Sequence, residues 1–422
     1  MADTSQAQAN AATQPAGCPF SGSSSSQIPP FPRPRQRVFD PPLEYIGLED
    51  DRSVFRVRLW NGDIAWVITN HADYKTVLGD PRFSADPTTP GFPGQSAALQ
   101  ASRKKYPSFV SMDPPKHTAQ RRMVTGEFAA RRIGQMRPKL QKIVDDLIDT
   151  MIEKGPPADL VECFALAVPS FVICELMGIP YSDHEFFQSR TRIFTSNAAS
   201  MEAALAANRE LVDEYLAGLL KRKNEDPQDD LLSRLMIEHV RTGHLTEHEV
   251  LSMARMLLIA GHETTANMIA LGTLLFLQHP DQLEFLRRDP GLAPAAVEEI
   301  MRYLSIAHSG QRRVAKEDVE ISGQLIRAGE GIVAFQSAAN RDSKVFSDPD
   351  KFDIRRDARQ QVGFGFGVHG CLGQYLARVE LQIVFTTLFS RLPNLALAAP
   401  IETLKFKDDM LVYGVEHVPV TW

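Results

Sequence analysis

The chain has 422 residues, of which 43% are hydrophobic and 23% are charged, and these values are typical of a soluble globular protein. Its formal net charge of −6 argues against general binding of nucleic acid. The four cysteines contain no CxxC pair, which argues against a disulfide framework and favours a reducing compartment. We therefore expect a cytoplasmic protein with neither nucleic acid nor a membrane as a partner.

Residues 1–30 are polar and of low complexity, and they lack the basic start and apolar run of a signal peptide. We expect a disordered N-terminal tail, with Cys18 as an exposed thiol. No linker interrupts residues 31–422, which predicts a single large domain. Two apolar stretches, 160–179 and 250–277, contain charged residues, so we expect buried helices there and not membrane spans.

The first predicted element is a β-hairpin over Val54–Thr69, because alternating β-formers flank Asn61-Gly62. A short helix over 71–79 follows. Residues 84–108 contain too many prolines and glycines for one regular element, and a loop of this length is usually functional.

Next comes a basic pair in which His117 and Arg121 lie four residues apart, on a helix that starts after Pro114 and Pro115. On such a helix both side chains point the same way, so they could clamp a carboxylate. The alternative is a solvated basic helix face.

The chain then continues through a helix over 133–154 and further helices over 158–240. Phe187, Phe194 and Met201 are candidates to line a pocket, although a plain core position is as good an interpretation for each.

A capping box, Thr246 with Glu249, begins an apolar helix of about 32 residues that ends at His279-Pro280. Glu263 and Thr264 stand in the middle of this helix, next to Gly261. Buried polar groups cost free energy when they are unpaired, so the presence of this acid and hydroxyl in an apolar helix requires a structural or functional explanation. A threonine that bonds back to its own helix is the structural alternative.

Glu299 and Arg302 lie three residues apart on the next predicted helix, where they can form an ion pair. An isolated pair at this spacing is usually a surface bridge. Residues 319–337 alternate as a β-hairpin around Gly323.

The ten residues Phe364–Gly373 place Cys371 among four glycines, directly before an apolar helix that begins near Leu372 and runs to Arg391. A helix start favours the thiolate form of a cysteine, and glycines let a backbone lie against a flat partner. The loop suits a thiolate ligand to an iron that a macrocycle already holds. The alternative is a buried, inert cysteine.

At these residues the chain resembles the cytochrome P450 superfamily, in its soluble bacterial class I form. Phe364, Gly367, Cys371 and Gly373 match the haem-thiolate loop of that family, and His369 stands where the family carries arginine or histidine. The resemblance implies a mainly α fold with a smaller β region, shaped as a triangular prism. In that fold haem b lies between a long central distal helix and a proximal helix. Cys371 would be the iron ligand.

The resemblance also implies roles for the residues singled out above. The haem propionates would meet His117, Arg121 and Arg313, and His369 would bind the haem from the cysteine loop. Gly261 would leave room for dioxygen, Thr264 would hydrogen-bond it, and Glu263 would relay protons. The substrate would meet Ala260, Gly261, Ala307 and His308, although His308 could also be a plain loop histidine. Glu299 and Arg302 would be locked by Arg355 or Arg356.

The implied activity is monooxygenation of an apolar small molecule by O2. The chain carries no Rossmann fingerprint and no cysteine set for an iron–sulfur cluster. We therefore expect NAD(P)H to act indirectly, through a ferredoxin and a ferredoxin reductase. Candidate docking residues are Arg355, Arg356, Arg359 and Arg378.

A second hypothesis comes from stretches that resemble the fungal nitric oxide reductase of the same superfamily, among them Leu59–Thr69 and Pro107–His117. That enzyme takes hydride directly from NAD(P)H, whose phosphate could meet Arg103, Lys104 and Lys105. Glu263-Thr264-Thr265 is the oxygen-activating form, which favours the monooxygenase. The same pair argues against a haem-based gas sensor or carrier.

Overall fold

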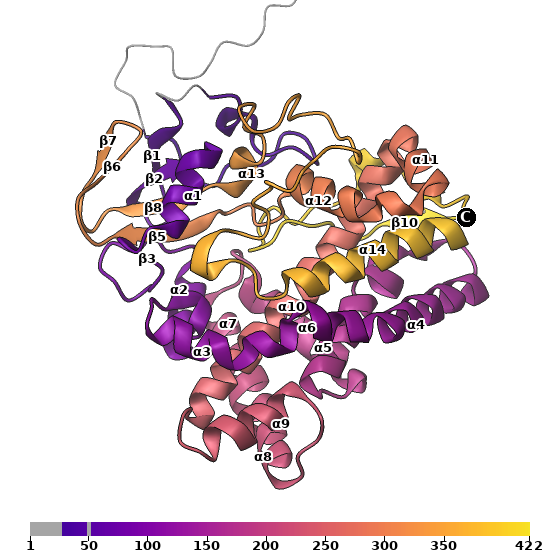
Figure 1. The fold of residues 1–422 in the computed structure, drawn as a ribbon, viewed down its shortest axis with the longest axis horizontal. Helices are drawn as coiled ribbons and strands as arrows, with labels where there is room; N and C mark the ends of the chain where they lie inside the picture. Colours follow the sequence, from indigo (N-terminus) through magenta and orange to yellow (C-terminus); the bar gives the residue numbers. More distant parts are fainter. Residues whose placement is uncertain (1–27, 49–51) are drawn as a thin grey trace, which may run out of the picture.

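The computed structural model describes residues 28–48 and 52–422 and is mainly α-helical with a smaller β region, which confirms the expected fold class (Figure 1). Residues 1–27, with Cys18, lie outside the described residues. From Pro29 onward the backbone is held in the fold, because Arg58 N donates to Pro29 O (2.8 Å) and Phe31 N donates to Arg58 O (2.9 Å). Within the described ranges, no helix combines the length and apolar character needed to cross a membrane.

The helices make up most of the molecule. They are α1 (His71–Gly79), α2 (Ala97–Lys105), α3 (Lys116–Thr125), α4 (Ala130–Lys154), α5 (Ala167–Met177), α6 (His184–Thr195), α7 (Met201–Asn208), α8 (Ala217–Glu225), α9 (Leu231–Leu235), α10 (Glu247–Gln278), α11 (Pro280–Arg288), α12 (Ala293–Leu304), α13 (Gln336–Ala339) and α14 (Gln374–Arg391). Three π-helical segments extend neighbouring helices, namely η5 (Val161–Ala165), η7 (Arg209–Leu216) and η8 (Met236–Val240).

Helix α10 runs through the middle of the molecule and packs against α5, α12 and α14 (Figure 1). Its predicted capping box is confirmed, since the Thr246 hydroxyl accepts from Glu249 N and the Glu249 carboxylate accepts from Thr246 N. Most of its residues are buried, as expected for a helix that is apolar on nearly every face. The middle of α10 therefore lies at the centre of the fold.

The strands form one five-stranded sheet and two smaller ones. The large sheet has the order β1 (Val54–Arg58), β2 (Ile64–Ile68), β8 (Gly331–Ala334), β5 (Gln311–Ala315) and β3 (Phe83–Ser84). A second sheet joins β4 (Ala158–Asp159), β10 (Pro419–Thr421) and β9 (Ala396–Leu397), and a two-stranded ribbon joins β6 (Val319–Ile321) and β7 (Gln324–Ile326). The hairpin predicted at Asn61-Gly62 is confirmed, with β1 and β2 antiparallel and Gly62 at φ +89°.

Three sequence expectations differ from the structure. The hairpin expected over 319–337 is confined to β6 and β7, because the fully buried β8 pairs with β2 and β5 in the large sheet instead. The part of 84–108 that is free of proline and glycine forms α2, whose first turn is capped by Ser96 Oγ accepting from Leu99 N. The helix after Cys371 begins at Gln374 and not near Leu372.

Candidate active site

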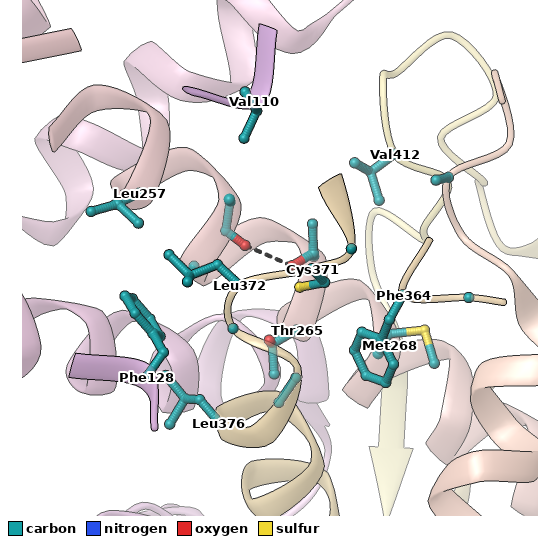
Figure 2. Close-up of a pocket in the computed structure, with 18 of the residues that line it drawn as sticks. Val110, Phe128, Leu257, Thr265, Met268, Phe364, Cys371, Leu372, Leu376 and Val412 are labelled. Atoms are coloured by element: carbon teal, nitrogen blue, oxygen red, sulfur yellow. Dashed lines mark hydrogen bonds between the residues drawn. The ribbon is translucent and has the colours of Figure 1, made fainter. Parts of the chain in front are cut away.

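A cavity of about 270 Å³ lies between α10 and the Phe364–Gly373 loop. Figure 2 shows Val110, Leu257 and Val412, which come from three distant parts of the sequence, around the Cys371 sulfur. Most of the lining is apolar. It includes Phe109, Val110, Phe128, Ile173, Met256, Leu257, Ala260, Gly261, Thr264, Thr265, Met268, Ile306, Ala307, Phe364, Cys371, Leu372, Leu376, Ala377, Glu380 and Val412.

The cysteine loop closes on itself, because Cys371 N donates to Phe364 O (2.8 Å). Gly367 has φ +70°, and a Cβ there would lie 2.5 Å from the Leu78 carbonyl oxygen, so no other residue fits against α1. Burial raises the pKa of the Cys371 thiol, whereas the Gly373 N–H, Arg121 and Arg378 oppose that rise. A bound metal cation would deprotonate this thiol, and the loop presents its sulfur to the cavity.

Four basic side chains gather beside the loop, and we call them the cation cluster: His117, Arg121, Arg313 and His369. The rings of His117 and His369 lie 4.3 Å apart between centroids. Burial lowers the pKa of His117 and Arg121, that of Arg313 to about 10 and that of His369 to about 3. The charges of Arg121 and Arg313 add to this decrease at both histidines, whereas Asp113 opposes it at His117, Arg313 and His369. Arg121 and Arg313 thus place positive charge at this edge of the cavity.

The cation cluster also has unmet hydrogen-bonding capacity. Both ring nitrogens of His117, Nδ1 of His369 and one terminal nitrogen of Arg313 are buried without a partner in the described structure. Buried polar groups without partners are rare in native proteins, so these atoms point to an absent ligand. Two carboxylates, such as the propionates of a haem, fit both the charge and the donors.

Glu263 and Thr264 are neighbours on α10 but face different surroundings. Thr264 lines the cavity, and its Oγ1 donates to Ala260 O (2.7 Å). Glu263 is buried among α6 and the C-terminal segment, where its Oε2 accepts from Thr195 Oγ1 (3.3 Å). Burial raises the pKa of Glu263, with Lys407, Thr195 and Arg192 acting in the opposite direction. The acid therefore stands behind the hydroxyl, and not in the cavity itself.

Three of the four residues expected at the substrate line the cavity, namely Ala260, Gly261 and Ala307. A Cβ on Gly261 would lie 2.6 Å from Cδ1 of Ile173, so this glycine also permits the close packing of α5 on α10. His308 is absent from the described lining. Its Nε2 bonds to Met410 O (2.7 Å), so His308 fastens the C-terminal segment behind the cavity wall.

The aromatic and methionine candidates on α6 and α7 also lie away from the cavity. Phe187 packs against the His262 ring, and Phe194 lies beneath the Arg255 guanidinium, whose Cζ atom is 4.8 Å from the ring centroid. Met201 is exposed on the surface. None of the three belongs to the lining of the described cavity.

Glu299 and Arg302 form a fully buried ion pair, with Arg302 Nε donating to Glu299 Oε2 (2.7 Å). The sequence left Arg355 and Arg356 open as the third member, and the structure selects Arg356, whose Nε donates to Glu299 Oε1 (3.2 Å). Arg355 lies beside Asp353 instead. This triad joins α12 to the segment that leads into the cysteine loop.

The basic residues considered for docking are all paired with acids. Arg378 pairs with Glu298 (2.5 Å), and Arg359 pairs with Asp357 (2.6 Å). On α2, Lys105 pairs with Asp213, whereas Arg103 donates to Gln95 Oε1 (3.1 Å).

Two polar residues near the cavity escaped the sequence analysis. Glu380 on α14 lines the cavity at 2% exposure, and burial raises its pKa to about 8 against a hydrogen bond from Thr265. The sequence feature that could have indicated Glu380 is an isolated acid in the apolar part of α14. Lys407 donates to Asn267 Oδ1 (3.0 Å) from the C-terminal segment, and nothing local marks it.

The chain matches known proteins across most of its length. A family model described as Cytochrome P450 matches residues 291–395. Cytochrome P450-SU2 of Streptomyces griseolus is 49% identical over 384 residues, covering 91% of this chain and 94% of that protein. Pentalenic acid synthase of Streptomyces avermitilis is 47% identical over 401 residues, covering 95% and 99%. The crystal structure of mycinamicin VIII C21 methyl hydroxylase from Micromonospora griseorubida, bound to mycinamicin VIII, has a TM-score of 0.89 at 36% identity. That match covers 94% of this chain and 100% of the hydroxylase.

Proposed function

The chain belongs to the cytochrome P450 family of haem-thiolate monooxygenases, and from this we propose that it inserts one atom of dioxygen into an apolar small organic molecule. The proposal rests on one observation. Cys371, with its sulfur, and Thr264, with its hydroxyl, line the same apolar cavity. The other oxygen atom would leave as water, which requires two electrons and two protons.

Five side chains of this chain are proposed to hold the haem. Cys371 would bind the iron, and the cation cluster would bind the two propionates through donors that have no partner in the described structure. When bound, the haem supplies the redox chemistry that activates dioxygen, and a thiolate ligand favours O–O cleavage. The residues around Cys371 exclude water from this site, because Phe364, Leu372 and Leu376 line it.

We assign proton delivery to Thr264 and Glu263. The Thr264 hydroxyl lies on the cavity wall, and its oxygen keeps acceptor capacity while its proton is donated to Ala260 O. Glu263 would store a proton on its buried carboxyl group, since burial raises its pKa and keeps it protonated at a higher pH than a free glutamate. A general acid transfers protons efficiently when its pKa lies near the pH at which the enzyme works.

The proposed substrate class follows from the lining of the cavity, which is mostly apolar. Among the relatives are a mycinamicin VIII C21 methyl hydroxylase and a pentalenic acid synthase. From these relatives we infer for this chain only the hydroxylation of an apolar organic molecule.

Electrons are proposed to come from a cytoplasmic ferredoxin and its NAD(P)H-dependent reductase. The proposed docking surface is a cleft lined by Arg355, Arg356, Arg359 and Arg378, which lies beside α14. All four arginines are paired with carboxylates, so an acidic partner would have to compete with or bridge these pairs.

The test is reconstitution of the haem-loaded protein with a ferredoxin, its reductase and NADPH under labelled dioxygen. We expect a library of small apolar compounds to yield at least one product that carries a single labelled oxygen atom. A second assay adds nitric oxide and NADH without a redox partner. Rapid nitrous oxide formation there, with no labelled product in the first assay, would overturn the monooxygenase proposal.

A further inference from the structure

A buried polar cluster lies on the face of α10 that carries Glu263. We call Glu263, Asn267 and Lys407 the lysine cluster, and their exposed fractions are 6%, 2% and 6%. Glu263 and Asn267 are four residues apart on α10, so their side chains are neighbours on one helix face. Lys407 reaches this face from the C-terminal segment, where its Nζ donates to Asn267 Oδ1 (3.0 Å). The chemistry proposed above uses only the first of these three residues.

Backbone contacts hold the C-terminal segment against this face. A Cβ on Gly414 would lie 2.1 Å from Asn267 Oδ1, so the backbone of the segment touches the amide. Lys407 N donates to Gly414 O (2.9 Å), and Leu411 N donates to Thr195 O (2.9 Å). The hydroxyl of that threonine bonds in turn to the acid of the lysine cluster. The segment is therefore fastened beside the acid without the ammonium group, whose burial requires another explanation.

The lysine cluster has hydrogen-bonding capacity that the protein does not meet. A lysine can only donate, so its contact places the amide oxygen of Asn267 toward Lys407 and leaves Nδ2 as the free nitrogen. Asn267 Nδ2 is buried without a hydrogen-bond partner in the described structure. The ammonium group has three donors, and Asn267 Oδ1 is the one side-chain acceptor for them among residues 28–48 and 52–422. Buried donors of this kind are rare in native proteins, and ordered water commonly satisfies them.

The acid and the lysine interact without touching. Glu263 bonds to Thr195 and Lys407 bonds to Asn267, and no direct ion pair joins Glu263 to Lys407 in the part of the chain that the structure describes. The charge of Lys407 nevertheless opposes the rise that burial causes in the pKa of Glu263, and Glu263 opposes the fall in the pKa of Lys407. Polar groups that are close but beyond hydrogen-bond reach are often bridged by water. One water here would give Asn267 Nδ2 its acceptor and join the cation to the acid.

The lysine cluster also has exposed charged neighbours. Arg192 on α6 is exposed, and its charge acts to lower the pKa of both Lys407 and Glu263. Glu416 on the C-terminal segment acts in the opposite direction on Lys407. Asp408, the next residue after Lys407, is exposed as well. Lys407 therefore lies between solvent-exposed residues and the buried acid.

We propose that Lys407 returns protons from solvent to Glu263 through one water molecule held by Asn267 Nδ2. After Glu263 has passed its proton toward Thr264, the carboxylate takes a proton from this water, the water takes one from the ammonium group, and the neutral amine regains one from solvent. Only protons move. Burial supports the transfer, because it lowers the pKa of the lysine and raises that of the acid, which brings the two values closer. The inference rests on the monooxygenase function proposed above and extends its proton delivery to solvent.

Lys407→Met and Lys407→Arg together separate proton transfer from an effect of charge alone. Arginine keeps the positive charge but does not give up a proton in proteins. In the reconstituted, haem-loaded enzyme at equal haem content, both variants should therefore make about tenfold less product per NADPH than wild type and more hydrogen peroxide. In both, product formation should also show a larger solvent deuterium isotope effect. Lys405→Arg is the matched control, because Lys405 is exposed and pairs with Glu416, and it should behave as wild type.

The water is tested without turnover, in a high-resolution crystal structure of the haem-loaded protein. It should show one ordered water within hydrogen-bond distance of Asn267 Nδ2 and of the Glu263 carboxyl, and Asn267→Leu should remove this water. An empty site in wild type would overturn the proposal. Wild-type product yield in Lys407→Arg, together with loss of yield in Glu263→Gln, would also overturn it while the proposed function stands. Absence of labelled product from wild type would instead overturn the proposed function, and the crystal structure would still decide whether the water is present.

Discussion

Lys407 holds its ammonium group against Asn267, one helical turn from Glu263 on α10, with a Nζ to Oδ1 distance of 3.0 Å. Lys407 is 6% exposed and Asn267 is 2% exposed, so this contact lies in the protein interior. Residues four apart share a helix face, which places the lysine charge on the side of the helix that carries the acid. The C-terminal segment thereby reaches the group that we assign to proton storage.

Replacing Lys407 should change the titration of Glu263. The lysine charge lowers the pKa of Glu263, so Lys407→Met should raise it further above its usual range. In the reconstituted enzyme, the limb of the pH–rate profile that belongs to Glu263 should move to higher pH, and it should vanish in Glu263→Gln. Lys405→Met serves as the control, because Lys405 is exposed and pairs with Glu416. A shift of equal size in both lysine variants would refute the assignment.

The Thr264 hydroxyl should control how much oxygen consumption ends in product. Thr264→Ala removes the only hydroxyl of α10 that we place in proton delivery, so product per NADPH should fall about tenfold or more while hydrogen peroxide rises. Thr273→Ala is a matched control, because Thr273 Oγ1 makes the same back-bond, to Ile269 O, at a buried site outside the cavity lining. Product and peroxide yields in Thr264→Ala that match those of Thr273→Ala would remove Thr264 from the mechanism.

Glu380 should make the protein less stable as pH rises. The folded protein keeps this carboxyl protonated up to a pKa of about 8, whereas the unfolded chain loses the proton near 4.5. Unfolding then releases a proton between these values, and stability falls by up to about 1.4 kcal/mol per pH unit across that window. Glu380→Gln should therefore flatten the urea-unfolding profile and be more stable than wild type by about 2 kcal/mol or more at pH 8, with little difference at pH 5.

The matched control for this prediction is Glu402→Gln, at an exposed glutamate. It should leave the pH dependence of unfolding unchanged. Parallel wild-type and Glu380→Gln profiles between pH 5 and pH 8 would show that Glu380 is ionised in the folded protein.

Breaking the buried Glu299–Arg302 pair should be costly. Both side chains have no exposed area, so Arg302→Met leaves a carboxylate buried with Arg356 as its remaining cation. We expect a loss of about 3–5 kcal/mol in the free energy of unfolding, together with poor haem retention. Arg288→Met removes a surface pair with Glu284 and should cost less than about 1 kcal/mol. Similar losses in the two variants would contradict the structural role of the buried pair.

The sequence by itself determined the features that depend on neighbouring residues. Asn61-Gly62 set the first hairpin and the Thr246–Glu249 capping box set the start of α10, because turns and caps are made by residues a few positions apart. The glycines around Cys371 likewise marked a loop that a side chain would disrupt, as the approach of Leu78 to Gly367 shows.

Tertiary structure alone decided the contacts between segments far apart in the chain. It selected Arg356 over Arg355, turned His308 toward Met410, and removed β8 from the expected hairpin. It also brought Lys407 to α10. Local patterns cannot encode these contacts, because burial and the charges of distant residues become defined only when the chain has packed.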